Sequence, residues 1–378
     1  MIGRVTESPY LTGSKQIVEV GQIRVLKDQF PEVVYGDKIE VFGKLEPKVT
    51  KKLINEYWLY SEKIAIVDRG KAATFWIKSV RLLVGFRRSL ENRLSLILPE
   101  PESSLLSGIL LGTRSTISKD FLQDLQTTGV VHLIAASGYN IAVVAGAVLF
   151  FFSSFLMRKR ALILSFLAII LYTLMAGAGP AVVRAAIMGS LTYLAQLYGR
   201  EKEAVRALAI SAYLMLFIKP LILFDIGFQL SFSATAGILF TLPIFDKITF
   251  FQKNSFGKEI SLTLAAQTGV LPIVLYHFQS VSLLSPAVNV MVAPLVPYIM
   301  SFGALTAITG LLFTPLGRLV SLPVWVLLTT MVKLISFFGR LSWANFKITS
   351  LPLWLVLIYY FVLVMMLIYI RHRELNKN

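Results

Sequence analysis

The chain has 378 residues, of which 56% are hydrophobic and 15% are charged, and its mean hydropathy is +0.70. Soluble domains carry about 25% charged residues, so this composition excludes an ordinary soluble protein and predicts a mainly α-helical, polytopic membrane protein. The formal net charge of +16 fits either anionic lipid headgroups or a polyanionic substrate. The sequence contains no cysteine, which excludes disulfides, thiolate metal ligands and a cysteine nucleophile.

Residues 1–73 form a separate unit in which short alternating segments are separated by glycine and proline. The segments KQIVEV, QIRVL, KIEVFGKLEP and WLYSEKIAIV predict β-strands, and several short strands at this spacing are typical of a small barrel. The stretch VVYGDKIEVFGKL, in which a turn feeds a strand and then a glycine kink, is typical of OB-type barrels. Basic and acidic residues are nearly balanced here, so a solvated surface and a nucleic-acid groove both remain open.

Residues 74–98 predict an amphipathic helix that ends before Pro99. Lys78, Arg81 and Arg88 fall on its polar face, whereas Arg87 is a misfit. A basic amphipathic helix that leads into membrane spans is typical of the membrane interface. Residues 105–118 are too short and too polar to span, so we expect 74–118 to be an interfacial helix and a linker. The apolar face of the helix is expected to hold Trp76, Val80, Leu83, Phe86, Leu90, Leu94 and Ile97.

Residues 119–378 contain the apolar segments expected of a multi-span membrane domain. A short helix is expected first, at 119–129, and a span needs about 20 residues. The segments at 204–219 and 286–312 are candidates for broken or re-entrant spans. The expected spans lie near 138–157, 161–177, 180–198, 204–219, 223–243, 260–277, 286–312, 316–338 and 351–370.

The basic residues between these segments predict the orientation of the chain. One side receives residues 158–160, Arg200, Lys247, Arg318 and the C-terminal tail, whereas the other receives only Lys219, Arg340 and Lys347. The positive-inside rule makes the first side cytoplasmic, which predicts a cell-membrane protein with its barrel outside and its C-terminus inside. No apolar signal-peptide segment opens the chain, so an exported barrel predicts a targeting segment upstream, unless the barrel is held differently.

Polar residues stand where several of the apolar spans begin. The stretch 127–146, TTGVVHLIAASGYNIAVVAG, also has small residues at Gly138, Ala142 and Gly146, whose spacing allows a second helix to come close. Polar groups at membrane depth must face protein or a watery cavity, so we expect a polar passage. Arg184 and Asp225 lie near the outer ends of their spans, where an ion pair is possible. The expected lining residues are His132, Ser137, Gly138, Asn140, Arg184, Asp225, Gln229, Ser231, Gln267 and Asn289.

Several of these residues have a structural alternative. Arg184 could snorkel or form a structural pair, and His132 could be a histidine of the packed core. Interhelical hydrogen bonding is the commoner role of Asn289 and of the serines in membrane helices.

No motif in the sequence indicates an enzyme. Ser137 lacks the G-x-S-x-G elbow, and neither an H-E-x-x-H nor a P-loop motif occurs. The three histidines, His132, His277 and His372, stand far apart and without metal-ligand spacing. We therefore expect no catalytic residue, no metal site and no cofactor.

Several stretches of the sequence together resemble the ComEC-type competence proteins, which internalise DNA in natural transformation. They are LLSGILLGTRSTISKDFLQDLQTTGVVHLIAASGYNI, GPAVVRAAIM, KPLILFDIGFQLSFSATAGI and LAAQTGVLPIVLYHFQSVSLLSPAVNVMVAPLVP, and they cover most of 105–300. In the family a second histidine or a similar residue follows the Ser-Gly pair, whereas this chain has Tyr139 and Asn140. Many members also carry a C-terminal metallo-β-lactamase-like domain, whereas this chain ends in RHRELNKN, so it resembles a short form, a fragment or half of a split system.

The resemblance implies an inner-membrane channel that passes single-stranded DNA into the cytoplasm. It also implies a cytoplasmic ATP-driven DNA translocase, and a DNA receptor and a nuclease outside the membrane, as partners besides the lipids, and it leaves a homo-oligomer open. The alternative is a small-solute or lipid transporter that uses the same cavity, and a third possibility is a membrane scaffold that recruits a nuclease. Binding of single-stranded DNA that weakens steeply with salt is expected of the channel only.

Overall fold

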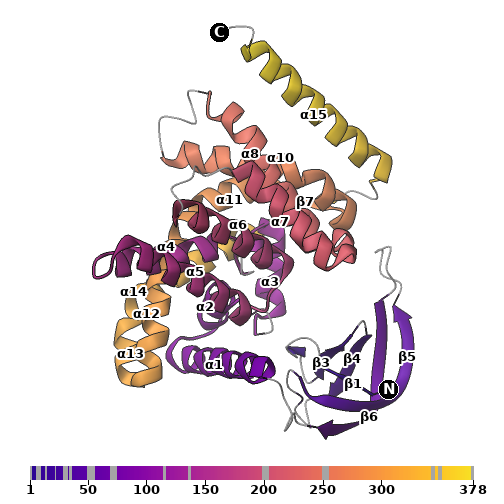
Figure 1. Ribbon diagram of the computed structural model, residues 1–378, viewed down its shortest axis with the longest axis vertical. Helices are drawn as coiled ribbons and strands as arrows, with labels where there is room; N and C mark the ends of the chain where they lie inside the picture. Colours follow the sequence, from indigo (N-terminus) through magenta and orange to yellow (C-terminus); the bar gives the residue numbers. More distant parts are fainter. Residues whose placement is uncertain are drawn as a thin grey trace.

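The computed structural model describes residues 2–5, 10–12, 15–21, 23–28, 33, 36–48, 56–68, 75–113, 116–134, 138–197, 204–248, 255–341, 345–347 and 351–375. The molecule is elongated and mostly helical, with a β-sheet unit near one end and the C-terminal helix at the other (Figure 1).

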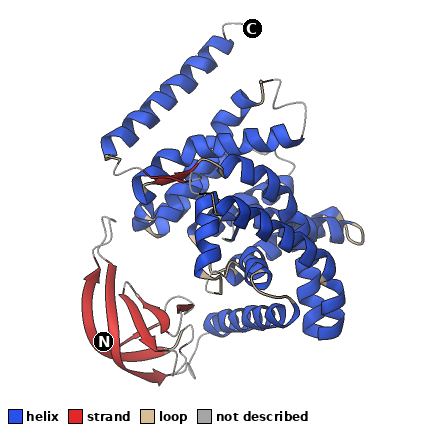
Figure 2. Ribbon diagram, turned by 180° about the vertical axis from the view of Figure 1, so that it is seen from behind, coloured by secondary structure: helices blue, strands red, loops and turns tan. Residues whose placement is uncertain are grey.

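The N-terminal unit is a single curled sheet of six strands. Its strands are β1 (Ile2–Arg4), β2 (Tyr10–Thr12), β3 (Lys15–Val20), β4 (Ile23–Asp28), β5 (Lys38–Lys48) and β6 (Glu56–Asp68). The order is β1-β5-β6-β4-β3-β2, with β4 and β6 parallel and the other neighbours antiparallel. The sheet curls into a half-barrel (Figure 2) around a core that includes Val18, Val25 and Ile39. This confirms the predicted OB-like unit.

The predicted glycine kink lies at a bulge between the two longest strands. The register of β5 against β6 shifts between Phe42 and Gly43. A Cβ atom built on Gly43 would lie 2.0 Å from the carbonyl oxygen of Tyr60. Only glycine allows this close approach of two backbones.

Helix α1 (Phe75–Ile97) connects the sheet to the helical domain (Figure 1). Its apolar face enters the main core in the second half of the helix, where Leu90 and Leu94 are buried. In the first half Leu82 and Phe86 stay exposed. The side chains of Trp76 and Val80 lie outside the described part of the chain. The predicted interfacial helix therefore also packs against protein along its C-terminal half.

The stretch predicted as a linker contains the most completely buried helix among the described residues. Helix α2 (Glu102–Leu111) has all ten of its residues buried. In sequence, its short length and its three serines resemble a loop. A helix that is surrounded by protein does not have to be long or apolar enough to cross a bilayer. Helix α3 (Lys119–Thr128) follows as predicted, with the Ser118 hydroxyl accepting the N-cap bond from Phe121 N, and then the 3-10 turn η1 (Val131–Ile134).

The remaining helices follow the predicted apolar segments closely. They are α4 (Gly138–Ser153), α5 (Arg158–Met175), α6 (Pro180–Leu197), α7 (Ala204–Ile218), α8 (Ile226–Phe245), α10 (Ser255–Phe278), α11 (Ser285–Val292), α12 (Val296–Leu312), α13 (Thr314–Val320), α14 (Leu322–Gly339) and α15 (Leu353–Leu375). Short 3-10 turns, η2 (Pro220–Phe224) and η3 (Ala293–Leu295), precede α8 and separate α11 from α12. The predicted break within 286–312 is therefore confirmed, whereas the other candidate, 204–219, forms the single unbroken helix α7. A small ladder joins β7 (Ser280–Ser282) to β8 (Asn345–Lys347).

Five helical segments in the described part of the chain are long and apolar enough to cross a membrane. They are 226–245, 257–278, 285–312, 322–339 and 353–370. The expected spans at 138–157, 180–198 and 204–219 form shorter apolar helices. The prediction of a multi-pass helical membrane protein is confirmed.

Two glycines bring α8 and α10 into backbone contact. A Cβ atom on Gly269 would lie 2.1 Å from the carbonyl oxygen of Ser233, and one on Gly237 would lie 2.5 Å from that of Ala265. Small residues at a helix crossing allow this approach, which packing in a bilayer favours. The resulting hairpin carries several of the predicted passage residues.

The C-terminal helix α15 is attached to α10 by two tyrosine hydroxyls. Pro272 lies inside α10 and has no N–H to donate to the carbonyl of Thr268. Tyr359 Oη donates to that oxygen at 2.9 Å, and Tyr360 Oη donates to the Gly269 oxygen at 2.7 Å. The tyrosines therefore supply hydrogen bonds where the proline removes one. Most other side chains of α15 are exposed, as expected of a helix in lipid.

Candidate functional site at the junction of α4, α6 and α8

Arg184 lies in the second turn of α6 and makes polar contacts with α8. Its Nε donates to Ser231 Oγ at 2.6 Å, and its Nη1 lies 3.3 Å from Met188 Sδ on its own helix. The guanidinium carbon is 6.0 Å from the centre of the Phe232 ring. Among the described residues no carboxylate lies within ion-pair distance of it. Arg184 is thus a half-buried cation with neutral neighbours.

The possible ion pair between Arg184 and Asp225 is not formed. Asp225 instead caps the N-terminus of α8, where its Oδ1 accepts a hydrogen bond from Phe228 N at 3.1 Å. A carboxylate is favoured at this position because it satisfies a free backbone N–H and complements the helix dipole. The Asp225 carboxylate also lies near the start of α6, since a Cβ atom on Gly227 would be 3.0 Å from Asp225 Oδ1 and 3.9 Å from Pro180.

Gly138, the first residue of α4, lies against the same arginine. A Cβ atom on Gly138 would lie 3.1 Å from Ala185 Cβ and 3.4 Å from Arg184 Nη2. By contrast, nothing lies within 4 Å of a Cβ atom on Gly146, and Ala142 is exposed. Of the three small residues in the predicted stripe, Gly138 makes the close helix contact.

Gln229 and His277 form a second polar contact, between α8 and α10. His277 Nε2 lies 3.0 Å from Gln229 Oε1, and Gln229 Nε2 donates to the Leu223 carbonyl at 3.0 Å. Gln229 and Ser231 belong to the same end of α8. The structure therefore brings Gly138, Arg184 and Ser231 together, whereas Gln229, in the same end of α8, contacts His277 and Leu223 instead.

The other predicted lining residues lie elsewhere. Asn140 is buried and donates to the Ile109 carbonyl near the end of α2 at 2.7 Å. Asn289 is buried and lies 3.3 Å from Ser285 Oγ, one turn earlier in α11. Gln267 is half-buried on α10, and His132 is exposed on η1. Ser137 lies outside the described residues.

The three basic residues predicted for the polar face of α1 differ in their surroundings. Arg81 Nη2 forms a 2.7 Å ion pair with Asp37 Oδ1, whose side chain is only 1% exposed. Lys78 is exposed and Arg88 is half-exposed. The Arg81–Asp37 pair therefore attaches the sheet to α1, a role that the helix periodicity alone did not indicate.

One face of the sheet alternates aromatic and basic side chains. Across β5 and β6, Phe42 is opposite Lys63 and Lys44 is opposite Tyr60. All four are exposed. Lys44 forms a 3.3 Å surface ion pair with Glu46, a kind of contact that contributes little. Exposed rings next to cations on a sheet can stack bases and contact phosphates.

Sequence reasoning missed Phe232 and Met188, which sit beside Arg184. Their apolar character in a membrane span carries no signal of that contact. Elsewhere, a surface hollow of about 410 Å³ includes Glu100, Asp120, Asp124 and Arg340 in its lining, and it shares no residue with the Arg184 cluster. The described residues contain no group of three or more histidine, aspartate or glutamate side chains that could hold a metal ion.

These features define a multi-pass α-helical membrane protein with a small OB-like sheet unit at its N-terminus. Comparison with known families is specific: a model of the competence protein family matches residues 109–373. The chain therefore belongs to the competence protein family, and the resemblance predicted from the sequence is confirmed.

Two relatives illustrate the extent of the similarity. The chain is 28% identical to ComE operon protein 3 of Bacillus subtilis (strain 168) over 307 residues, which are 78% of this chain and 38% of that protein. It is 24% identical to an uncharacterized protein of Aquifex aeolicus (strain VF5) over 311 residues, which are 82% of this chain and 68% of that one. The chain thus spans well under half the length of the Bacillus protein. No solved structure matches the chain.

Proposed function

We propose that this protein forms the passage through which a single DNA strand crosses the cell membrane during DNA uptake. The observation that carries the proposal is Arg184, a half-buried guanidinium that contacts Ser231 and Met188 and has no carboxylate partner among the described residues. A cation removed from water normally has a counter-charge. A phosphodiester that passes the junction of α4, α6 and α8 would supply one, whereas a neutral solute would not.

The proposed path begins on the sheet. Phe42 and Tyr60 can stack successive bases while Lys44 and Lys63 contact phosphates, and Lys78 and Arg88 on α1 continue the basic track. Inside the membrane, Arg184, Ser231, Gln229 and Gly138 form the narrow part of the passage. His132, Ser137, Asp225 and Gln267 are further proposed lining residues, whereas Asn140 and Asn289 are buried and hydrogen-bonded within the protein and have a structural role in this proposal.

We propose that the sheet lies outside the cell and the C-terminus in the cytoplasm. Arg184 lies near the N-terminal ends of α4, α6 and α8, and the positive-inside rule places these ends outside the cell. The basic residues 158–160, at the N-terminal end of α5, fall on the cytoplasmic side by the same rule. Helix α1 has 23 residues, which is about 34 Å at 1.5 Å per residue. We infer that α1 runs from the outer sheet into the helical domain.

The driving force in this proposal comes from another protein. The sequence has no nucleotide-binding motif, so a cytoplasmic ATP-driven translocase would pull the strand. A receptor and a nuclease outside the membrane would deliver it as a single strand.

Replacement of Arg184 tests the proposal. We expect Arg184→Ala to abolish internalisation of end-labelled DNA while surface-bound DNA and protein level stay normal, and Arg184→Lys to retain part of it because the charge remains. Arg158→Ala, at the exposed start of α5, is the control and should internalise DNA normally. Normal internalisation by Arg184→Ala would refute the assignment of this residue.

A further inference from the structure

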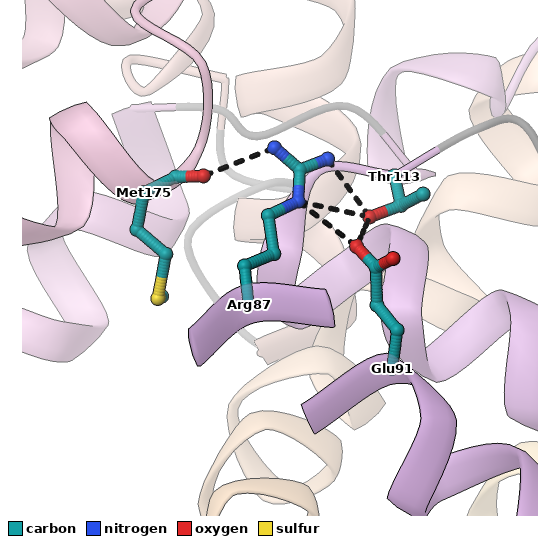
Figure 3. Close-up of polar contacts among 4 residues, drawn as sticks. All are labelled: Arg87, Glu91, Thr113 and Met175. Carbon is teal, nitrogen blue, oxygen red and sulfur yellow. Dashed lines mark hydrogen bonds and ion pairs between the residues drawn. The ribbon is translucent and has the colours of Figure 1, made fainter. Parts of the chain in front are cut away.

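Arg87, the misfit of the α1 pattern, joins three segments of the chain. Its Nε lies 2.9 Å from Glu91 Oε1 on the next turn of α1, and its Nη2 donates to Thr113 Oγ1 at 2.8 Å (Figure 3). Its Nη1 donates to the Met175 carbonyl at 3.0 Å, and the Thr113 hydroxyl donates to the Glu91 carboxylate. Each of the three guanidinium nitrogens therefore has a partner, and the side-chain exposure is only 17%.

The two distant contacts of Arg87 are made to helix ends. Thr113 follows Gly112, the left-handed C-cap of α2, and Met175 is the last residue of α5. The last carbonyls of a helix have no partner within the helix, and a cation is favoured there by the helix dipole. Arg87 therefore attaches α1 to the ends of α2 and α5 at once.

The turn that follows Met175 determines where α6 begins. Gly177 and Ala178 both have positive φ, at 88° and 50°, and Pro180 starts α6. A Cβ atom on Gly177 would lie 3.8 Å from Arg87 Nη1. Arg184 is one helical turn after Pro180, so any shift of this turn moves Arg184 relative to Ser231 and Gly138.

We propose that Arg87 is a positioning residue that holds the α5–α6 turn, and hence Arg184, in register with α1. Arg81, six residues before Arg87 on the same helix, forms the ion pair with Asp37 that attaches α1 to the sheet. The sheet and the Arg184 junction therefore have one common support. The role in DNA passage rests on the proposed function, whereas the positioning itself does not.

A distance measurement in the purified full-length chain tests the positioning directly. Because the chain has no cysteine, spin labels can be attached to cysteines at Ser89 on α1 and Leu194 on α6, both exposed and outside the junction. We expect one narrow distance distribution in the parent chain and a shifted or broadened one in Arg87→Ala. Arg93→Ala is the matched control on the same helix, because Arg93 is exposed and its one hydrogen bond to the described residues is to Thr314 Oγ1, at 3.2 Å.

Two milder variants keep the test decisive if Arg87→Ala does not fold. Arg87→Lys keeps the charge but loses the forked guanidinium that contacts two helix ends at once. Its distance distribution should be broader than that of the parent chain and narrower than that of a chain without any side-chain contact at position 87. Thr113→Val removes the shared hydroxyl and should broaden the distribution less. Distributions identical to that of Arg93→Ala in every folded Arg87 variant would overturn the proposal.

Uptake provides a separate readout. We expect Arg87→Ala to lower internalisation with surface-bound DNA unchanged, and Arg87→Lys to restore part of it. If the parent chain internalises no DNA, the proposed function fails while the distance result still stands. If distances change and internalisation does not, the turn is positioned by Arg87 but has no part in DNA passage, and that part of the proposal is overturned.

Discussion

Gly269→Ala is expected to force apart the helix hairpin that supports the Arg184 junction. The new Cβ atom would lie 2.1 Å from the Ser233 carbonyl oxygen, whereas ordinary contact begins near 3.4 Å. The obstacle is backbone and cannot rotate away, so α8 and α10 must separate by about 1 Å. Overpacking of this kind costs about 1–3 kcal/mol. The 3.0 Å contact between His277 and Gln229 would then exceed hydrogen-bond length.

Thermal unfolding of the purified chain in detergent, followed by tryptophan fluorescence, measures the loss of stability. Gly146→Ala on α4 is the matched control, because nothing lies within 4 Å of its added Cβ atom. It should be neutral or stabilising by up to about 1 kcal/mol, since alanine favours the helix. Gly237→Ala should destabilise like Gly269→Ala, and the double variant less than additively, because one separation relieves both contacts. Equal stability of Gly269→Ala and Gly146→Ala would refute the close crossing.

Two further outcomes are expected from other parts of the molecule. Tyr359→Phe and Tyr360→Phe together should lower the free energy of unfolding by about 1–3 kcal/mol, because the Thr268 and Gly269 carbonyls lose their hydroxyl donors. Tyr369→Phe, exposed on the same helix, is the control. Equal stability of the double variant and of this control would contradict the attachment of α15. Phe42→Ala with Tyr60→Ala should weaken binding of single-stranded DNA to the full chain by about 1–3 kcal/mol per stacked base, measured by fluorescence anisotropy. The exposed pair Leu353→Ala with Trp354→Ala should leave that affinity unchanged, and a sheet-face variant that binds as tightly as the parent would exclude this surface from the path.

Composition and periodicity predicted most of the architecture because the signals were local. The strands of the sheet, the helix at 119–129 and nearly every apolar segment were recognisable from alternation, caps and turn residues. The break within 286–312 was also predicted, and Pro294 lies in the 3-10 turn that separates α11 from α12. Local chemistry decides each of these features.

The failures concern contacts between distant segments. Helix α2 was taken as a linker because a ten-residue segment with three serines resembles a loop unless its burial is known. The possible Arg184–Asp225 pair was wrong because the N-cap of α8 offered the carboxylate a nearer partner. Arg87 was recognised as a misfit, but its partners at Thr113 and Met175 are 26 and 88 residues away, beyond any helical spacing.

Photocrosslinking during uptake can detect DNA as it passes the Arg184 junction. A photoreactive benzoylphenylalanine would replace Phe232, whose ring is 6.0 Å from the Arg184 guanidinium. The same residue in place of Phe361, which is exposed on α15, is the control. We expect a light-dependent adduct with single-stranded DNA at position 232, formed only in cells that are internalising DNA, and none at position 361. Active uptake without an adduct at 232, or equal adducts at both positions, would contradict it.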